Sequence, residues 1–257
     1  MNVIYFSPTR TSAKIAESIA YGMGAQSVDE LNIQDLTYPD SASVKNYARQ
    51  EGAVIIAAPV YAGRIAQTAV ERLSLIKGEG NPAVVVAVYG NRDYEDALVE
   101  LQDLAESCGF RTIAGAAFVG EHSYSRPGMP TAGGRPDPSD LEIAFGFGKA
   151  VKEKLEQEKS ETELILPGNR PYVYKGPFTP ATPITADELC TQCGTCIDYC
   201  PMDAITLQDE IVSDIELCIK CCACVKICPN EARIFNTPYT ELLHKNFSRR
   251  REPELYL

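Results

Sequence analysis

Residues 190–201 read CTQCGTCIDYCP, and residues 218–229 read CIKCCACVKICP. Both stretches follow the spacing C-x2-C-x2-C-x3-C-P, and both are followed by a residue pair of the form Asp/Glu-Ala, at 203–204 and 231–232. Of the ten cysteines in the chain, nine lie in this region, and the tenth is Cys108. The pattern therefore indicates a duplicated half-module whose purpose is to hold thiols at fixed spacing.

Three thiolates at two-residue spacing let a tight loop wrap one face of a metal cluster, and in iron–sulfur proteins with this run the fourth cysteine ligates the other cluster. This predicts two [4Fe–4S] clusters. One is assigned to Cys190, Cys193, Cys196 and Cys228, and the other to Cys218, Cys221, Cys224 and Cys200. The extra thiol, Cys222, lies outside the register and is predicted to pack against a cluster without ligating it.

Two zinc sites are the alternative, because C-x2-C pairs also bind zinc. Zinc needs neither a third evenly spaced cysteine nor a following C-P, and here both occur twice. The segment 187–236 resembles the dicluster bacterial-type ferredoxins, with all eight ligand positions matched.

The composition limits the classes of function. The chain has 257 residues and a net charge of −11, which argues against a nucleic-acid binder, since such proteins need a basic footprint. No stretch approaches the roughly 20 apolar residues of a membrane span, and no signal peptide is visible. We expect a cytoplasmic protein in a reducing, anaerobic cell, because clustered thiols outside a small secreted domain point to metal rather than disulfides.

The first half of the chain alternates between strand-like and helix-like segments. Apolar, β-branched runs predict strands at residues 3–6, 53–58, 83–89 and 112–119, with a weaker one at 26–31. Helical periodicity predicts helices at 11–22, 66–76, 94–108 and 137–158. Alternating βα units predict an α/β fold, a five-stranded doubly wound parallel sheet of flavodoxin-like order 2-1-3-4-5, followed by a small dicluster ferredoxin-like α+β domain.

The predicted organisation has four parts. Residues 1–159 form the flavodoxin-like domain, 160–186 a proline-rich linker, 187–236 the cluster domain and 237–257 a tail of unassigned role. The linker segment at 168–172, Gly-Asn-Arg-Pro-Tyr, is expected to help dock the cluster domain.

Hydroxyl residues crowd the turn that follows the first predicted strand. A strand-to-helix turn of this kind presents amides, hydroxyls and a helix N-terminus to an anion. Simple helix capping needs one hydroxyl, not four. The turn resembles the flavodoxin phosphate loop, S/T-x-T-G-x-T/S, with Arg10 in place of the glycine. The resemblance implies FMN phosphate binding by Ser7, Thr9, Arg10, Thr11 and Ser12.

Two further turns are predicted at the same edge of the sheet, after the third and fourth strands. Ligands of doubly wound sheets bind outside the carboxyl ends of the strands at the topological switch point. In flavodoxins these turns enclose the isoalloxazine ring, which makes Tyr61 and Tyr94 candidates for stacking. The remaining candidate contacts are Pro59, Val60, Ala62, Gly63, Tyr89, Gly90, Asn91 and Arg92. The alternative is that each tyrosine only packs at a helix start.

A long glycine-rich loop follows the last predicted strand, and long ordered loops are often functional. Its candidate proton donors are His122, Tyr124 and Arg126, although a histidine satisfied by packing is the simpler interpretation of His122.

As a whole the chain resembles the flavodoxin–ferredoxin fusion proteins of anaerobes, the iron–sulfur flavoproteins or EFR-type ferredoxins. The resemblance implies FMN and two [4Fe–4S] clusters, and two functions fit it. The first is an electron carrier between redox proteins, such as a ferredoxin or an oxidoreductase. Nine acidic against three basic residues in 187–236 suit a basic partner. The second is a flavin-dependent oxidoreductase that reduces a small molecule. The oligomeric state stays open, a dimer included.

Overall fold

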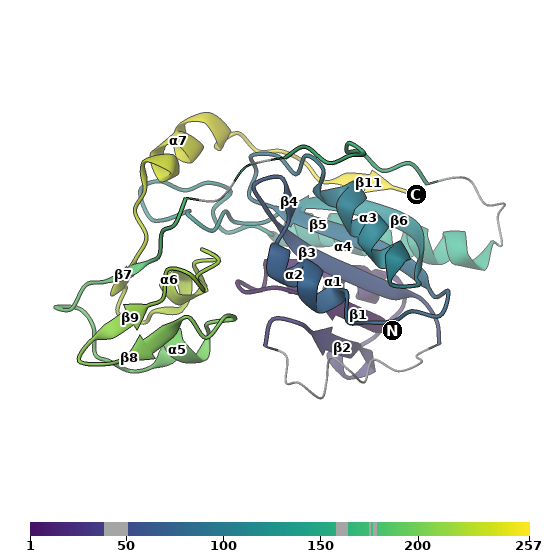
Figure 1. Cartoon of the computed structure of the whole chain (residues 1–257). Helices are drawn as coiled ribbons and strands as arrows, with labels where there is room; N and C mark the ends of the chain where they lie inside the picture. Colours follow the sequence, from purple (N-terminus) through teal and green to yellow (C-terminus); the bar gives the residue numbers. More distant parts are fainter. Residues whose placement is uncertain (39–50, 158–163, 175, 177–178) are drawn as a thin grey trace.

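A computed structural model describes residues 1–38, 51–157, 164–174, 176 and 179–257. Figure 1 shows a large sheet with helices on both faces and a smaller unit beside it, to which the chain leads and from which it returns. The predicted boundary at residue 159 lies outside the described residues.

The centre of the large sheet is made of apolar runs that are buried on both faces. Its five parallel strands lie side by side in the order β2-β1-β3-β5-β6, which in chain order is 2-1-3-4-5, the flavodoxin-like arrangement. These strands are β1 (Asn2–Tyr5), β2 (Asn32–Asp35), β3 (Val54–Tyr61), β5 (Pro82–Tyr89) and β6 (Arg111–Val119). All five therefore end at one edge of the sheet.

Helices cover the sheet in two layers, each with its own core. On one face α1 (Thr11–Gly22) and α4 (Pro138–Glu156) pack over alternate strand residues such as Val3 and Ile55. On the other, α2 (Gln67–Leu73) and α3 (Ala97–Ser107) pack over Ile4 and Ile56. Among the described residues no helix is both long and apolar enough to cross a bilayer.

Two sequence predictions about the sheet were wrong. The strand predicted at 26–31 is instead a short 3-10 helix, η1 (Val28–Glu30), and the strand itself is β2. This edge strand is only partly buried, so its polar residues gave no apolar signal. The sheet is also larger than five strands, because β4 (Arg64–Ile65) and β11 (Glu254–Tyr256) join it in antiparallel pairing.

The smaller unit is built from short elements around the cysteine runs. Cys196, Ile205, Ile211 and Cys224 form its buried centre. The elements are β7 (Ile184–Thr185), α5 (Thr195–Asp198), β8 (Ile205–Leu207), β9 (Ile211–Ser213), α6 (Ala223–Ile227) and β10 (Arg233–Ile234).

The linker lies along α3 before it reaches the smaller unit. The backbone and side-chain amides of Asn169 donate to Asp96, and Arg170 forms an ion pair of 2.6 Å with Asp103. Gly168 has φ 138°, and a Cβ there would lie 2.3 Å from Val99. The segment 168–172 therefore docks the linker itself to the sheet domain, by a contact that only glycine allows.

The tail returns from the smaller unit to the sheet (Figure 1). After α7 (Pro238–Phe247), the amide of Asn91 donates to the carbonyls of Phe247 and Arg249 at 2.6 and 2.8 Å. The side-chain carbonyl of Asn91 accepts a hydrogen bond from the backbone amide of Arg251. The chain then ends with β11 paired to β6.

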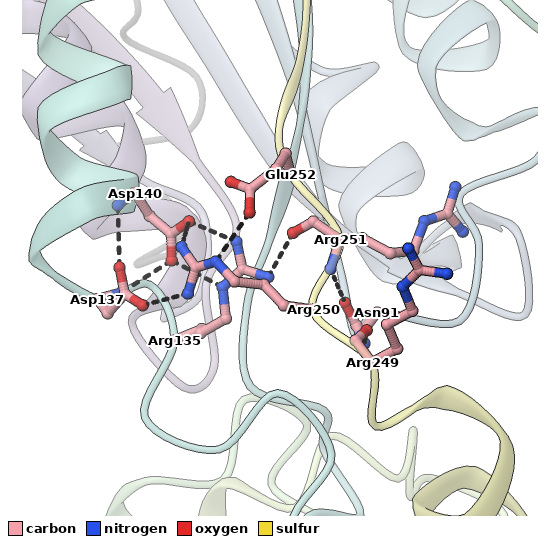
Figure 2. A network of polar contacts seen from close by, with 8 residues as sticks. All are labelled: Asn91, Arg135, Asp137, Asp140, Arg249, Arg250, Arg251 and Glu252. Carbon is pink, nitrogen blue, oxygen red and sulfur yellow. Dashed lines mark hydrogen bonds and ion pairs between the residues drawn. The ribbon is translucent and has the colours of Figure 1, made fainter.

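A polar network fixes this tail to the start of α4, as Figure 2 shows. Asp137 caps α4 in a reciprocal capping box with Asp140, and Arg250 forms an ion pair with Asp137 at 2.6 Å. Arg135 binds Asp140 with two nitrogens and also donates to the carbonyl of Arg251. The side chains of Arg135 and Asp140 are 5% and 0% exposed, so this pair is shielded from water.

Asp140→Asn should lower the free energy of unfolding by about 3–5 kcal/mol, because it leaves a buried guanidinium without its counter-charge. The measurement is urea unfolding followed by far-UV circular dichroism under anaerobic conditions. Lys152→Gln is the matched control, since it breaks an ion pair whose side chains are 51% and 63% exposed. A loss below about 1 kcal/mol is expected there, and equal losses in the two variants would contradict the assignment.

Candidate metal and cofactor site

The cysteines of the smaller unit line two separate cavities. One, here called the distal cavity, is lined by Cys190, Cys193, Cys196 and Cys228 together with backbone of their loops. The other, the proximal cavity, is lined by Cys200, Cys218, Cys221 and Cys224. Each cavity thus takes three thiols from one repeat and the fourth from the other. Cys222 also lines the proximal cavity and is 2% exposed.

The loops present backbone amides to the sulfurs. Ala204 and Ala232 occupy equivalent positions in the two repeats, and their amides donate to the sulfurs of Cys200 and Cys228 at 3.3 and 3.2 Å. The amide of Gln192 donates to Cys190 at 3.4 Å. Such hydrogen bonds stabilise thiolates and tune the potential of a bound cluster.

The two cavities differ in exposure. Burial raises the pKa of Cys221 to about 12 and that of Cys224 to about 11, whereas a hydrogen bond from Thr195 lowers the pKa of the exposed Cys193. Buried thiols of this kind become thiolates only when a positive metal centre compensates them. The proximal cavity is therefore the drier of the two.

Four thiols of the predicted ligand set line each cavity, as a [4Fe–4S] cluster with four cysteine ligands requires.

The proximal side of the smaller unit contacts the carboxyl edge of the sheet. Arg72 of α2 donates to the carbonyl of Pro201, next to Cys200, at 2.7 Å. The same guanidinium donates to the carbonyls of Leu36 and Thr37, which follow β2. Lys226 forms an ion pair of 2.6 Å with Glu121 in the loop after β6.

Tyr61 lies at this contact between the two units. Burial raises the pKa of its hydroxyl well above the ordinary value. The nearby thiols of Cys221 and Cys222 add to the rise, and a hydrogen bond with Ser123 opposes it. A side chain at the end of β3 thus lies near two thiols of the proximal cavity.

The turn after β1 keeps polar groups free for an anion. Ser7 caps the start of α1 by accepting from the amide of Ala13 at 3.1 Å. Ser12 is fully buried, and among the described residues its hydroxyl has no hydrogen-bond partner. Arg10, at φ 63°, turns back to bind Tyr5 and Glu17. An orphaned hydroxyl beside a helix N-terminus fits a phosphate group.

The other members of this turn, Thr9 and Thr11, are partly exposed. Thr11 lies close to the end of β6, where a Cβ on Gly120 would approach its Cβ to 3.0 Å.

The turns after β3 and β5 contact each other. The amide of Asp96 donates to the carbonyl of Gly63, and a Cβ on Gly63 would meet the Glu95 carboxylate at 2.6 Å. Pro59 and Val60 belong to the end of β3, where Val60 pairs with Ile65 of β4. Ala62 has φ 53° and is exposed.

The tail occupies much of the turn after β5. The side chain of Asn91 forms hydrogen bonds with the tail backbone, and the carbonyl of Arg92 accepts a hydrogen bond from Arg251. Tyr94 is buried, with its hydroxyl 2.6 Å from Glu254 and 3.1 Å from that of Tyr256. Tyr89 is buried below it with no partner for its hydroxyl among the described residues. In this arrangement Tyr94 is a core residue with no face open to a ring.

Two of the three candidate proton donors, Tyr124 and Arg126, contact residues beyond the sheet domain. His122 packs on Gly90, where a Cβ would meet its ring at 2.4 Å, and its Nδ1 accepts from the amide of Tyr124. Tyr124 stacks edge-on against Phe235 and Tyr239. Arg126 donates to Asn236.

Sequence reasoning missed several residues of this site. Asn91 was proposed as a flavin contact, but its role as anchor of the tail depends on residues about 160 positions later and leaves no local signal. Arg72 also had no signal, because it looks like any exposed helix charge. Arg233 did have one: it breaks the repeat where the first copy has Ile205.

Comparisons with known proteins divide the chain in the same way. Residues 182–229 match the family model described as a 4Fe-4S dicluster domain. No curated protein matches the chain. The chain therefore joins an N-terminal flavodoxin-like sheet to a C-terminal iron–sulfur domain of a kind that transfers electrons.

Solved structures similar to the chain include a flavodoxin from the domain Archaea, at 14% identity, covering 61% of this chain and 99% of that one with a TM-score of 0.39. Flavodoxin 1 from Bacillus cereus is 15% identical, covers 62% and 98%, and also has a TM-score of 0.39. Rubredoxin oxygen:oxidoreductase from Desulfovibrio gigas is 15% identical, covers 61% and 36%, and has a TM-score of 0.45. These scores are low, and the fold is defined here by the strand order itself.

The half-buried His122 predicts a pH-dependent stability. Burial, together with the charges of Lys226 and Arg92, lowers its pKa from 6.5 to about 4. Below pH 6.5 the imidazole of His122 binds a proton in the unfolded chain but not in the folded chain. The free energy of unfolding is therefore highest above pH 6.5 and falls as the pH decreases towards 4. We expect a loss of about 1 kcal/mol between pH 7 and pH 5.5 by urea unfolding.

His122→Gln should remove this loss, and His244→Gln, at the other histidine, should retain it. An unchanged slope in His122→Gln would show that another group titrates.

Proposed function

We propose that the chain is an electron-transfer iron–sulfur flavoprotein of the flavodoxin–ferredoxin fusion type. One [4Fe–4S] cluster is held by Cys190, Cys193, Cys196 and Cys228, and a second by Cys218, Cys221, Cys224 and Cys200. The second cluster exchanges electrons with FMN at the carboxyl edge of the sheet, and the first exchanges them with a redox protein.

The observation that carries this proposal is the contact of the proximal cavity with the switch-point edge. Arg72 joins the backbone next to Cys200 to α2 and to the turn after β2, and Tyr61 lies beside Cys221 and Cys222. Electron transfer is efficient between centres that lie close together, and this contact supports a short path from the proximal cavity to the proposed FMN site. The more exposed distal cavity, with Cys193 at the surface, is the side open to a partner.

The phosphate end of the proposed FMN site fits the residues that are present. The buried, unpartnered hydroxyl of Ser12 and the first turn of α1 would hold the phosphate, with Ser7, Thr9 and Thr11 around it. Bound flavin supplies one- and two-electron chemistry that the protein's own side chains lack. Tyr61 and Gly63 are the ring-side candidates that remain, since the tail engages Asn91 and Tyr94.

The carrier is favoured over reduction of a small molecule because Tyr124 and Arg126 are engaged with the smaller unit and His122 packs on Gly90. A surface surplus of acidic residues on the cluster domain suits a basic protein partner. Ten free thiols fit a reducing compartment.

Cys200→Ser should remove about half of the iron, because one of two [4Fe–4S] clusters loses a ligand. It should also uncouple the flavin from the remaining cluster. The measurement is an anaerobic stopped-flow mix of the reduced, FMN-loaded chain with oxidised ferredoxin, followed by flavin absorbance. We expect rapid flavin oxidation in the wild type and slow oxidation in Cys200→Ser.

Cys222→Ser is the matched control, since Cys222 lines the same cavity outside the ligand register. Cys222→Ser should keep the iron content of the wild type and its rate of flavin oxidation by ferredoxin. Rapid oxidation by a small quinone but not by ferredoxin would contradict the carrier and support the oxidoreductase.

Ser12→Ala should weaken FMN binding about 10- to 100-fold, because a hydrogen bond to a charged group contributes roughly 1.5–3 kcal/mol. The dissociation constant for FMN is measured by fluorescence titration. Riboflavin, which lacks the phosphate, is the control ligand and should bind both proteins equally. Since the hydroxyl has no partner among the described residues, the free energy of unfolding without FMN should not fall. Equal loss for both ligands would contradict a phosphate role.

A further inference from the structure

Arg233 breaks the symmetry of the cysteine repeat. Five residues after the fourth cysteine, the first copy has Ile205 and the second has Arg233. Ile205 is 4% exposed and packs with Cys196 and Cys224 in the centre of the smaller unit. Arg233 is 2% exposed, although arginine is almost never fully buried unless it is paired. A charged side chain therefore occupies a position that the fold fills elsewhere with a hydrocarbon.

Among the described residues, the hydrogen-bond partners of Arg233 are neutral. Its guanidinium donates to the hydroxyl of Thr185 at 2.7 Å, to the carbonyl of Pro183 at 3.0 Å and to the hydroxyl of Ser213. Its Nε is buried without a partner, and among the described residues no carboxylate lies within ion-pair distance. A buried charge that is not compensated costs several kcal/mol. The positive charge of Arg233 is therefore not compensated by any carboxylate of the described residues, and another group must supply the negative charge.

Arg233 also lies between the two cavities. It lines the distal cavity, and two of its partners, Pro183 and Ser213, line the proximal cavity, as Cys224 does. One cation thus lies next to both sets of thiols.

We propose that Arg233 is the internal counter-charge of the two iron–sulfur clusters and raises their reduction potential. The inference rests on the cluster assignment in the proposed function. A [4Fe–4S] cluster with four thiolates carries a net negative charge, and one added electron makes it more negative by one unit without a proton. A fixed positive charge in a dry interior stabilises the reduced form more than the oxidised form. Elsewhere in 187–236 the basic residues are Lys220 and Lys226, and Lys226 is already paired with Glu121.

The test is an EPR-monitored redox titration of the purified holo chain, in variants that separate charge from shape. Arg233→Ile restores the residue of the first repeat, Arg233→Gln keeps hydrogen-bonding atoms, and Arg233→Lys keeps the charge. For Arg233→Ile and Arg233→Gln we expect at least a tenfold smaller equilibrium constant for reduction of one or both clusters. For a one-electron couple this is 59 mV toward more negative potential. Arg233→Lys should stay close to the wild type.

Lys226→Gln is the control for loss of one positive charge from the same domain, and its shift should be much smaller. Loss of clusters in Arg233→Ile and Arg233→Gln but not in Arg233→Lys also supports the proposal, because charge is then the requirement. Unchanged potentials overturn it, and so does loss of clusters in all three variants, which would assign Arg233 a structural role through Thr185 and Ser213. The wild-type spectrum reports separately whether the clusters of the proposed function exist.

Discussion

The antiparallel pairing of β11 with β6 determines how the rest of the molecule is held. It brings the end of the chain back to the sheet after the cysteine-rich unit, while the linker on α3 holds the other end of that unit. A unit held at both ends has few orientations open to it. The contacts of Arg72 and Lys226 with the sheet edge therefore form at small entropic cost, because the two surfaces are already neighbours.

Polar groups carry this attachment more than apolar burial does. Asn91 and Arg135 bind tail carbonyls, and Tyr94 binds Glu254 from within the core. Hydrogen bonds are directional, so they set the register of the tail as well as its affinity. The turn after β5 thereby serves the tail, and the side chains left at the switch-point edge come from the turns after β1 and β3.

Local pattern predicted most of the sheet but little of the attachment. Continuous apolar runs indicated β3, β5 and β6, since strands that are buried on both faces consist almost entirely of apolar residues. β2 was misplaced because Asn32–Asp35 is a half-exposed edge. β11 was missed because three residues, Glu254–Tyr256, become a strand only through a partner about 140 positions away. The cysteine spacing predicted which thiols share a cavity. The burial of Tyr94 and Asn91 under the tail was not predictable, since their partners lie about 160 positions later.

The position of β11 after the cysteine-rich unit has a consequence for biosynthesis. A ribosome completes β1 to β6 long before it reaches Glu254, so the edge of β6 stays unpaired while the cysteine-rich unit emerges. An unpaired strand edge is a template for association with other chains. The sheet acquires β11 only after the cysteine-rich unit has been synthesised, and the nascent protein needs protection at that edge until then.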